Sequence, residues 1–153
     1  NITITIAENQ LLAIGEDFEI VSRLIDGRYP DYKKIIPTKF SSFVRVDKKN
    51  LDKNIRMASV FSSSISDVRL GFDKGEIKIT AKNSDRGEIN ARLVCDLKNE
   101  PFDISVNYHY LLDGLRAISS DNILIEFVSN NAPIVVRGEN IKDQIYVIMP
   151  LRA

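Results

Sequence analysis

Residues 43–58 read FVRVDKKNLDKNIRMA, and a similar pattern returns 60 positions later, where residues 103–118 read DISVNYHYLLDGLRAI. Each stretch begins with alternating apolar and polar residues, which is typical of a strand. A helix-capping residue follows, Asp47 in the first stretch and Asn107 in the second. Three pairs of helix residues keep the same offset: Leu51 with Leu111, Ile55 with Leu115, and Arg56 with Arg116. The chain therefore contains an internal repeat.

Three strands are expected after each of the two helices. Alternation and turn residues predict them at residues 68–72, 76–81 and 88–97, and again at residues 122–128, 132–136 and 144–149. The first two are joined at Asp73-Lys74-Gly75, a hairpin signal. Two βαβββ units with one-sided helices predict one two-layer α+β domain over residues 38–153, with the helices packed side by side on antiparallel sheets.

The first part of the chain has a different organisation. Residues 2–7, 11–14 and 18–25 are predicted strands, and the turn-rich residues 26–37 are predicted to connect them to the next unit. Three strands alone are marginally stable because both faces of a sheet need covering. The chain also opens on Asn1, inside an alternating run. We therefore expect residues 1–37 to be the end of another domain plus a connector, in a longer protein.

Composition narrows the class of protein. The 153 residues include 21 Lys and Arg against 21 Asp and Glu, with 44% hydrophobic and 27% charged residues, which suits a globular chain. No apolar run approaches the roughly 20 residues that a membrane span needs. The single cysteine, Cys95, excludes an internal disulfide, and the single histidine, His109, excludes a Cys₂His₂ zinc site within one chain. We expect a cytoplasmic protein without a cofactor, a metal or a membrane partner.

The sequence contains no catalytic motif that we recognise. Phosphate-binding loops and the common hydrolase and metalloprotease signatures are absent. Cys95 lies on the inward register of its predicted strand, which favours a core residue over a nucleophile. His109 is most simply a residue on a helix surface. We therefore predict that the chain is not an enzyme by itself.

Basic residues gather on one side of the first helix. At about 100° per residue, Lys49, Lys53 and Arg56 lie opposite Leu51, Ile55 and Ala58. On the second helix, His109 and Arg116 face outward, although Asp113 interrupts the stripe. The residues alone leave two readings open: a solvated helix face, or a surface that holds phosphates without reading bases.

The end of the chain is apolar. Residues 146–153 read YVIMPLRA, so a strand runs directly into Met149, Pro150 and Leu151. Ordinary strand packing explains such a pattern, and so does a groove that binds an apolar peptide. The residues alone do not decide between them.

Two segments resemble a known family. Residues 24–37, LIDGRYPDYKKIIP, closely resemble the inter-domain connector of the bacterial DNA polymerase III β subunit, the replicative sliding clamp. Residues 147–152, VIMPLR, are similar to that family's C-terminal signature, and residues 107–112, NYHYLL, to its final helix. More than a hundred residues separate the connector from the terminus, so the resemblance spans the whole chain.

The resemblance implies a processivity factor of DNA replication. Clamp subunits have three domains of this repeat fold, and two subunits close head to tail around duplex DNA with helices lining the hole. The residues that would face DNA are Lys49, Lys53, Arg56, His109 and Arg116. The family also docks short linear motifs of polymerases, the clamp loader and repair proteins in a hydrophobic groove. Near-zero net charge agrees with a ring because only its inner face needs to be positive.

Matching the family residue by residue gives the expected groove. It comprises Pro30, Lys34 and Ile35 of the connector, Ile65, Asn107, Tyr110 and Pro133 of the third domain, and Met149, Pro150, Leu151 and Arg152 of the tail. Lys34 stands where arginine is common, and Ala153 where a larger apolar residue is common. The chain matches the end of the middle domain and the whole third domain, so we expect a homodimeric ring for the full-length protein and a monomer for this piece. The alternative is a generic α+β binding or assembly domain without a DNA role.

Overall fold

Two strand-to-helix corners organise the repeat. In the computed structural model, which describes residues 1–29 and 31–151, the Asp47 carboxylate accepts a hydrogen bond from the backbone N–H of Asn50 at 2.8 Å and begins helix α1 (Lys48–Ser59). Asn107 begins helix α2 (Tyr108–Ala117) by accepting from the backbone N–H of His109 at 2.9 Å. Both caps predicted from the sequence are confirmed.

The order of the elements repeats as predicted. The strands are β1 (Thr3–Ile6), β2 (Gln10–Ile14), β3 (Glu19–Arg23), β4 (Ser42–Asp47), β5 (Asp67–Asp73), β6 (Glu76–Asn83), β7 (Gly87–Val94), β8 (Asp96–Asn99), β9 (Phe102–Asn107), β10 (Asn122–Phe127), β11 (Ile134–Gly138) and β12 (Tyr146–Ile148), with a short 3₁₀ helix η1 (Tyr32–Lys34) before β4. One repeat runs β4-α1-β5-β6-β7 and the other β9-α2-β10-β11-β12, while β8 lies between them. The predicted α+β fold of two βαβββ units is confirmed.

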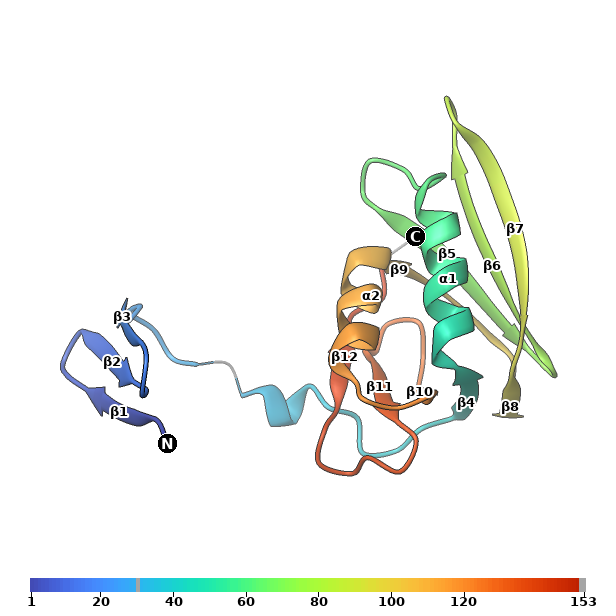
Figure 1. The fold of residues 1–153 in the computed structure, drawn as a ribbon. Helices are drawn as coiled ribbons and strands as arrows, with labels where there is room; N and C mark the ends of the chain where they lie inside the picture. Colours follow the sequence, from blue (N-terminus) through green and yellow to red (C-terminus); the bar gives the residue numbers. More distant parts are fainter. Residues whose placement is uncertain (30, 152–153) are drawn as a thin grey trace. The chain divides into compact units, whose positions relative to one another are not determined.

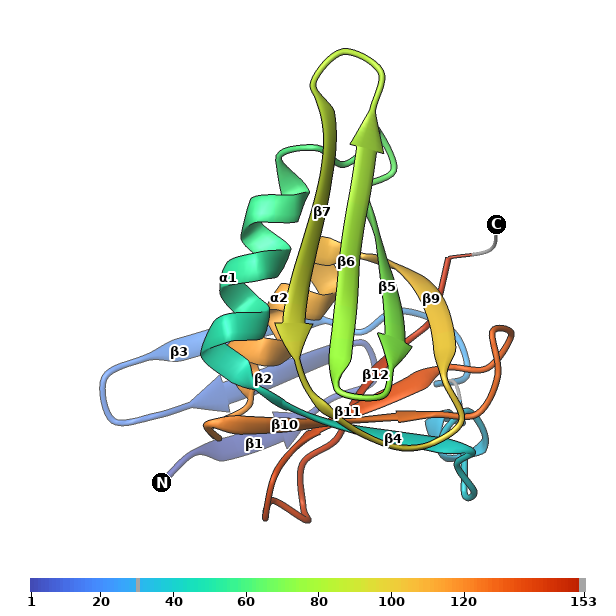
Figure 2. The ribbon, with the colours of Figure 1, turned by 90° about the vertical axis from the view of Figure 1, so that its right-hand side faces the viewer.

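The two repeats exchange their first strands. One sheet has the order β12-β11-β10-β4-β8, so β4 pairs with β10 of the other repeat. The second sheet has the order β7-β6-β5-β9, so β9 pairs with β5. All the strand pairs are antiparallel. The helices α1 and α2 contact each other (Figure 1), and α1 packs on β5, β6 and β7 behind the sheet that Figure 2 shows face on.

One predicted strand is wrong in extent. The sequence alternates from Glu88 to Leu97, but the structure ends β7 at Val94 and starts β8 at Asp96. The residue between them, Cys95, donates its backbone N–H to the Gly75 carbonyl oxygen at 3.1 Å. The chain thus leaves one sheet and joins the other, since β7 pairs with β6 whereas β8 pairs with β4. The first helix ends at Ser59, before the serines at positions 62–64.

The core lies between the helices and the sheets. The predicted apolar faces of the helices are confirmed: Leu51, Ile55 and Ala58 of α1 and Leu111, Leu115 and Ile118 of the α2 region are buried. Three phenylalanine rings join the two sheets, because Phe102 of β9 stacks on Phe72 of β5 at 4.4 Å and on Phe127 of β10 at 4.0 Å. This stack holds the exchanged strand β9 against both repeats.

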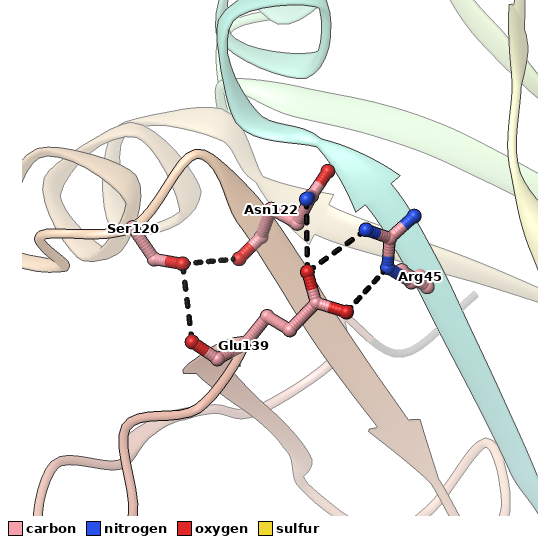
Figure 3. Close-up of polar contacts among 4 residues, drawn as sticks. All are labelled: Arg45, Ser120, Asn122 and Glu139. Carbon is pink, nitrogen blue, oxygen red and sulfur yellow. Dashed lines mark hydrogen bonds and ion pairs between the residues drawn. The ribbon is translucent and has the colours of Figure 1, made fainter.

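A polar cluster ties β4 to the end of β11 (Figure 3). The guanidinium of Arg45 donates two hydrogen bonds to the Glu139 carboxylate, at 2.6 and 2.9 Å. The Asn122 amide donates to the same carboxylate at 2.8 Å, and the Ser120 hydroxyl donates to the Asn122 carbonyl oxygen at 2.8 Å. The Arg45 side chain therefore holds the pKa of Glu139 below its ordinary value.

The chain forms two compact units, Asn1–Asp31 and Tyr32–Ala153. The first unit contains the sheet β1-β2-β3. No described residue in it is buried, and Ile4 and Ile20 are exposed. The helices, the other two sheets and the core belong to the second unit, which begins at η1.

Candidate functional site

A positively charged groove lies between the two helices. It has a volume of about 390 Å³ and is lined by Lys48, Lys49, Asp52 and Arg56 of α1 and by Leu115 and Arg116 of α2. Four cationic side chains therefore share the groove with one carboxylate, in a chain whose formal net charge is zero. Such a surface attracts anions.

Three of these cations are held in place by neighbours. The Lys48 ammonium donates to the Ile118 carbonyl oxygen at 2.7 Å, next to the negative end of the α2 dipole. The Arg56 guanidinium makes two hydrogen bonds to Asp52, at 2.7 and 2.9 Å. Arg116 lies 3.5 Å from Asp113, three residues earlier on the same helix. The two ion pairs are largely exposed, so they orient the side chains more than they stabilise the fold, whereas the bond from Lys48 is partly buried.

All five residues predicted to face DNA are exposed, namely Lys49, Lys53, Arg56, His109 and Arg116. The structure brings Lys49, Arg56 and Arg116 together in the groove, whereas Lys53 and His109 do not line it. The ring of His109 lies instead against that of Tyr108, at 4.1 Å between centroids. Lys48 is an additional groove residue that helical periodicity did not single out, because its role depends on the end of α2.

A second candidate surface begins at the cap of α2. The amide of Asn107 donates to the Ile65 carbonyl oxygen at 3.3 Å, and the backbone N–H of Tyr108 donates to Ser66 at 2.9 Å. The loop before β5 is thereby fixed to the start of α2. Ile65 itself is 60% exposed, so an apolar side chain is presented to solvent beside a polar cap.

Two grooves flank the tail of the chain. The first, of about 540 Å³, is lined by four apolar residues, Ile65, Ala81, Ile89 and Leu151, and by the polar residues Asp67, Arg69, Thr80, Lys82, Glu88, Asn90 and Ser105. The second, of about 450 Å³, is lined by Pro150 and Leu151 of the tail and by Arg69, Asp103, Ile104, Ser105, Asn130 and Asn131. The tail is fixed between them because the backbone N–H of Leu151 donates to the Ser105 carbonyl oxygen at 2.7 Å.

The strand that leads into the tail packs against α2. The ring of Tyr146 lies over Gly114, where an added Cβ would come within 2.5 Å of the ring. Burial raises the pKa of Tyr146, and the nearby Asp113 and Tyr110 raise it further. Tyr110 is therefore close to β12, which ends one residue before Met149, and both Tyr110 and Met149 are more than half exposed, at 58% and 54%.

The residues predicted for the peptide groove fall into three groups. Pro30 and Arg152 lie outside the described residues. Ile65, Pro150 and Leu151 line the two grooves, and Asn107 is hydrogen-bonded to Ile65. The remaining described residues of the prediction line neither groove: Lys34, Ile35, Tyr110, Pro133 and Met149. Ile35 is exposed after η1, and Pro133 is buried before β11.

Sequence reasoning missed the sheet residues of these grooves. Arg69 and Ser105 line both grooves, and Asp103 lines the second. The alternation of β9 does place Asp103 and Ser105 on the face opposite Phe102 and Ile104. What alternation did not provide is the position of β9 at the edge of its sheet, because pairing partners are distant in the sequence.

Other candidate sites do not gain support. The pKa of the Cys95 thiol is raised to about 11, mainly by burial and to a smaller extent by the charges of Asp96 and Glu76. A thiol with a raised pKa is a poor nucleophile, so Cys95 is better explained as a core residue. Among the residues that the structure describes, no group of three or more His, Cys, Asp or Glu side chains could hold a metal ion. None of the described helices has the length and apolarity that crossing a membrane requires.

Comparisons of this chain with known proteins agree on one family. The profile described as "DNA polymerase III beta subunit, C-terminal domain" matches residues 33–152. A beta sliding clamp of Streptococcus pneumoniae is 30% identical over 155 residues, and one of Vibrio cholerae is 28% identical over 152 residues. A crystal structure of a sliding clamp from Bartonella birtlesii bound to griselimycin superposes with a TM-score of 0.91 at 27% identity, covering 99% of this chain and 41% of that one.

The relatives are longer than this chain. The alignments cover 99% of it but only 42% of the Vibrio protein and 41% of the Streptococcus protein. The similarity therefore extends over both compact units, and the chain spans about two fifths of the curated relatives that it matches.

Proposed function

The chain belongs to the family of DNA polymerase III beta subunits, and from this membership we propose that it is part of a sliding clamp of bacterial DNA replication. The observation that carries the proposal is the family match over residues 33–152, which includes both helices and the two large sheets. In this proposal the chain is a non-catalytic processivity factor that acts in the bacterial cytoplasm. Its partners are duplex DNA and the proteins that the clamp recruits.

We assign residues 1–37 to the end of a middle clamp domain with its connector, and residues 38–153 to the complete C-terminal domain. Ring closure by a homodimer is proposed for the whole protein, since the relatives have more than twice the length of this chain.

The groove between α1 and α2 is the proposed DNA-facing surface. A clamp has to hold DNA and still slide along it, so it needs attraction to phosphates without contacts to base edges. Lys49, Arg56 and Arg116 supply such charges within one groove, and Lys53 adds a further exposed cation on α1. His109 is the remaining residue that we assign to this surface.

The groove beside the tail that Ile65 and Leu151 line is the proposed docking site for short linear motifs. Ile65 and Leu151 provide apolar walls, and Asn107 provides a polar group at one end. Exposed Met149 and Tyr110 extend the apolar surface, and the connector residues Lys34 and Ile35 complete it in this proposal. Apolar walls with a few polar groups suit a peptide that carries a glutamine followed by closely spaced leucine and phenylalanine.

A peptide titration tests this function. Isothermal calorimetry of such a peptide should detect binding to the parent chain, and Met149→Ala should weaken the affinity by about fivefold or more, because truncated apolar anchors commonly cost over 1 kcal/mol. The matched control is Met57→Ala, which removes the same side chain from an exposed position of α1. Equal loss in both variants, or no binding by a folded parent chain, would contradict the proposed docking site.

A further inference from the structure

The outer edge of β9 has backbone groups that face away from its sheet. β9 is the last strand in the order β7-β6-β5-β9, and Ser105 pairs with Arg69 of β5. Because the Ser105 carbonyl oxygen accepts from Leu151, it points away from β5. Backbone direction alternates along a strand, so the N–H and C=O of Asp103 point outward as well, whereas those of Ile104 point toward β5.

The internal repeat shows how the equivalent edge is covered. The 60-residue offset relates β9 to β4, with Ser105 at the position of Arg45. The outer edge of β4 is paired over four residues by β8, from Arg45 with Asp96 to Ser42 with Asn99. In the described part of the chain, β9 has no such strand on that side, and the tail contributes the bond from Leu151.

A groove runs beside this edge. It has a volume of about 450 Å³, and the residues that line it include Asp103, Ser105, Asn130, Asn131 and the tail residue Pro150. It shares Leu151, Arg69 and Ser105 with the groove that contains Ile65. The groove is therefore adjacent to the proposed docking site, on the other side of the tail, and has room beside the open backbone.

We propose that the β9 edge binds an extended peptide segment as an added strand, and that the occupant is the stretch flanking a docking motif in a partner protein. The inference rests on the proposed function, because the motif itself brings the flanking stretch to the edge. The Ser105 carbonyl oxygen is already bonded to Leu151, so the N–H and C=O of Asp103 and the N–H of Ser105 are the groups that pair with the segment. Backbone pairing supplies the affinity, so many flanking sequences fit provided that no proline falls at a pairing position. The Asn130 and Asn131 amides line the same groove, and amides can donate to and accept from the backbone of such a strand.

The same features disfavour a strand from a second folded copy. The groove that Asp103 and Ser105 share with Asn130 and Asn131 has a volume of about 450 Å³, which suits a short extended segment better than the edge of a folded domain. The edge also has little net charge, since the Asp103 carboxylate lies 3.7 Å from the Arg69 guanidinium. We therefore expect the edge to recognise the backbone of the segment rather than its charge.

Lengthened peptides test the inference. A fluorescent motif peptide is compared with versions carrying four added Thr and Val residues before or after the motif. One lengthened version should bind the full chain about tenfold more tightly, as two or so added backbone hydrogen bonds would give. N-methylation of alternate flanking residues should abolish the gain, while methylation of the intervening residues should leave it. Equal affinity of all three peptides, or a gain insensitive to N-methylation, overturns the inference.

A protein variant gives an independent readout. Asp103→Pro removes an outward N–H without removing a bond to β5, so it should keep the affinity for the short motif peptide and lose the gain from lengthening. In NMR spectra of the parent chain, the lengthened peptide should shift the Asp103 and Ser105 amide signals. If the short peptide fails to bind, the proposed function fails. In that case the flanking segment alone is added at high concentration, and if the Asp103 and Ser105 amide signals still do not shift, the edge inference fails too.

Discussion

Replacing two lysines of α1 gives the sharpest test of the proposed DNA-facing surface. Lys49 and Lys53 are exposed on the side of α1 opposite its buried residues, and neither makes an ion pair with another described residue. Glutamine has a helix propensity close to that of lysine, so the Lys49→Gln/Lys53→Gln variant should keep the fold and its thermal stability. The change removes two positive charges and little else.

The expected effect follows from counterion release. The slope of log affinity against log salt is about −0.9 for each phosphate contact with duplex DNA, so the double variant should reduce its magnitude by about 1.8. When the salt concentration falls from 1 M to 0.1 M, each phosphate contact then raises the affinity for DNA by about eightfold, and the two contacts together by about 60-fold. Binding by the parent chain should itself be weak and independent of DNA sequence, because only a few cations line the helix groove.

Fluorescence anisotropy with a labelled duplex, measured over a series of salt concentrations, gives these slopes. The matched control is Lys78→Gln/Lys82→Gln, which removes two exposed lysines from β6 on the far side of its sheet from α1. Its slope should equal that of the parent chain. Equal slopes for the two double variants would refute the assignment of the α1 surface, as would tight binding by the parent chain that does not respond to salt.

Three further predictions concern the fold and its titrating groups. Phe102→Ala, at the centre of the aromatic stack, should lower the free energy of unfolding by about 3–5 kcal/mol in urea titrations. Because the Arg45 contact lowers the pKa of folded Glu139, its contribution is present above the ordinary value of 4.5 and is lost as the pH falls to the lowered value. When urea titrations are repeated at falling pH below 4.5, the free energy of unfolding should therefore decrease less for Glu139→Gln than for the parent chain. The Cys95 thiol, with a pKa raised from 9.0 to about 11, should hold about 100-fold less thiolate than an ordinary cysteine, and a thiol reagent should react with it slowly until urea unfolds the chain.

Local features were predictable from the sequence because neighbouring residues determine them. The caps at Asp47 and Asn107 require only a short acceptor side chain before an N–H two or three residues later. The helix faces follow from the 3.6-residue period, so the burial of Leu51 and the exposure of Lys49 were both expected. The same reasoning holds for the repeat, which is a relation within the sequence itself.

Strand pairing was not predictable in the same way. Alternation continues through Cys95 without a break, yet the strand leaves one sheet for the other at this residue. The reason is tertiary: β8 completes the free edge of β4, which is about 50 residues earlier in the chain. A period of two identifies the buried face of a strand but not its neighbours. For the same reason the β9 edge and the grooves beside it became visible only in the structure.

The candidate sites were predictable to different degrees. The cationic side of α1 followed from helical periodicity, whereas Lys48 joined it only through the Ile118 carbonyl oxygen at the end of α2. The groove residues came from family resemblance rather than from chemistry in the sequence. Ile65 and Leu151, separated by more than 80 positions, line one groove because the tail is bonded to β9 and the loop before β5 to α2.

The exchange of first strands explains how one small domain can support two separate surfaces. Because β4 and β9 each belong to the sheet of the other repeat, neither repeat can complete its sheet alone, and the helices that follow these strands are brought into contact. α1 packs on the inner face of the β7-β6-β5-β9 sheet, while Arg69, Thr80 and Ser105 belong to its outer face. Charges on α1 and polar residues in the tail grooves are thus separated by the thickness of a buried sheet. Substitutions on one surface should leave binding at the other unchanged, since no described side chain belongs to both grooved regions.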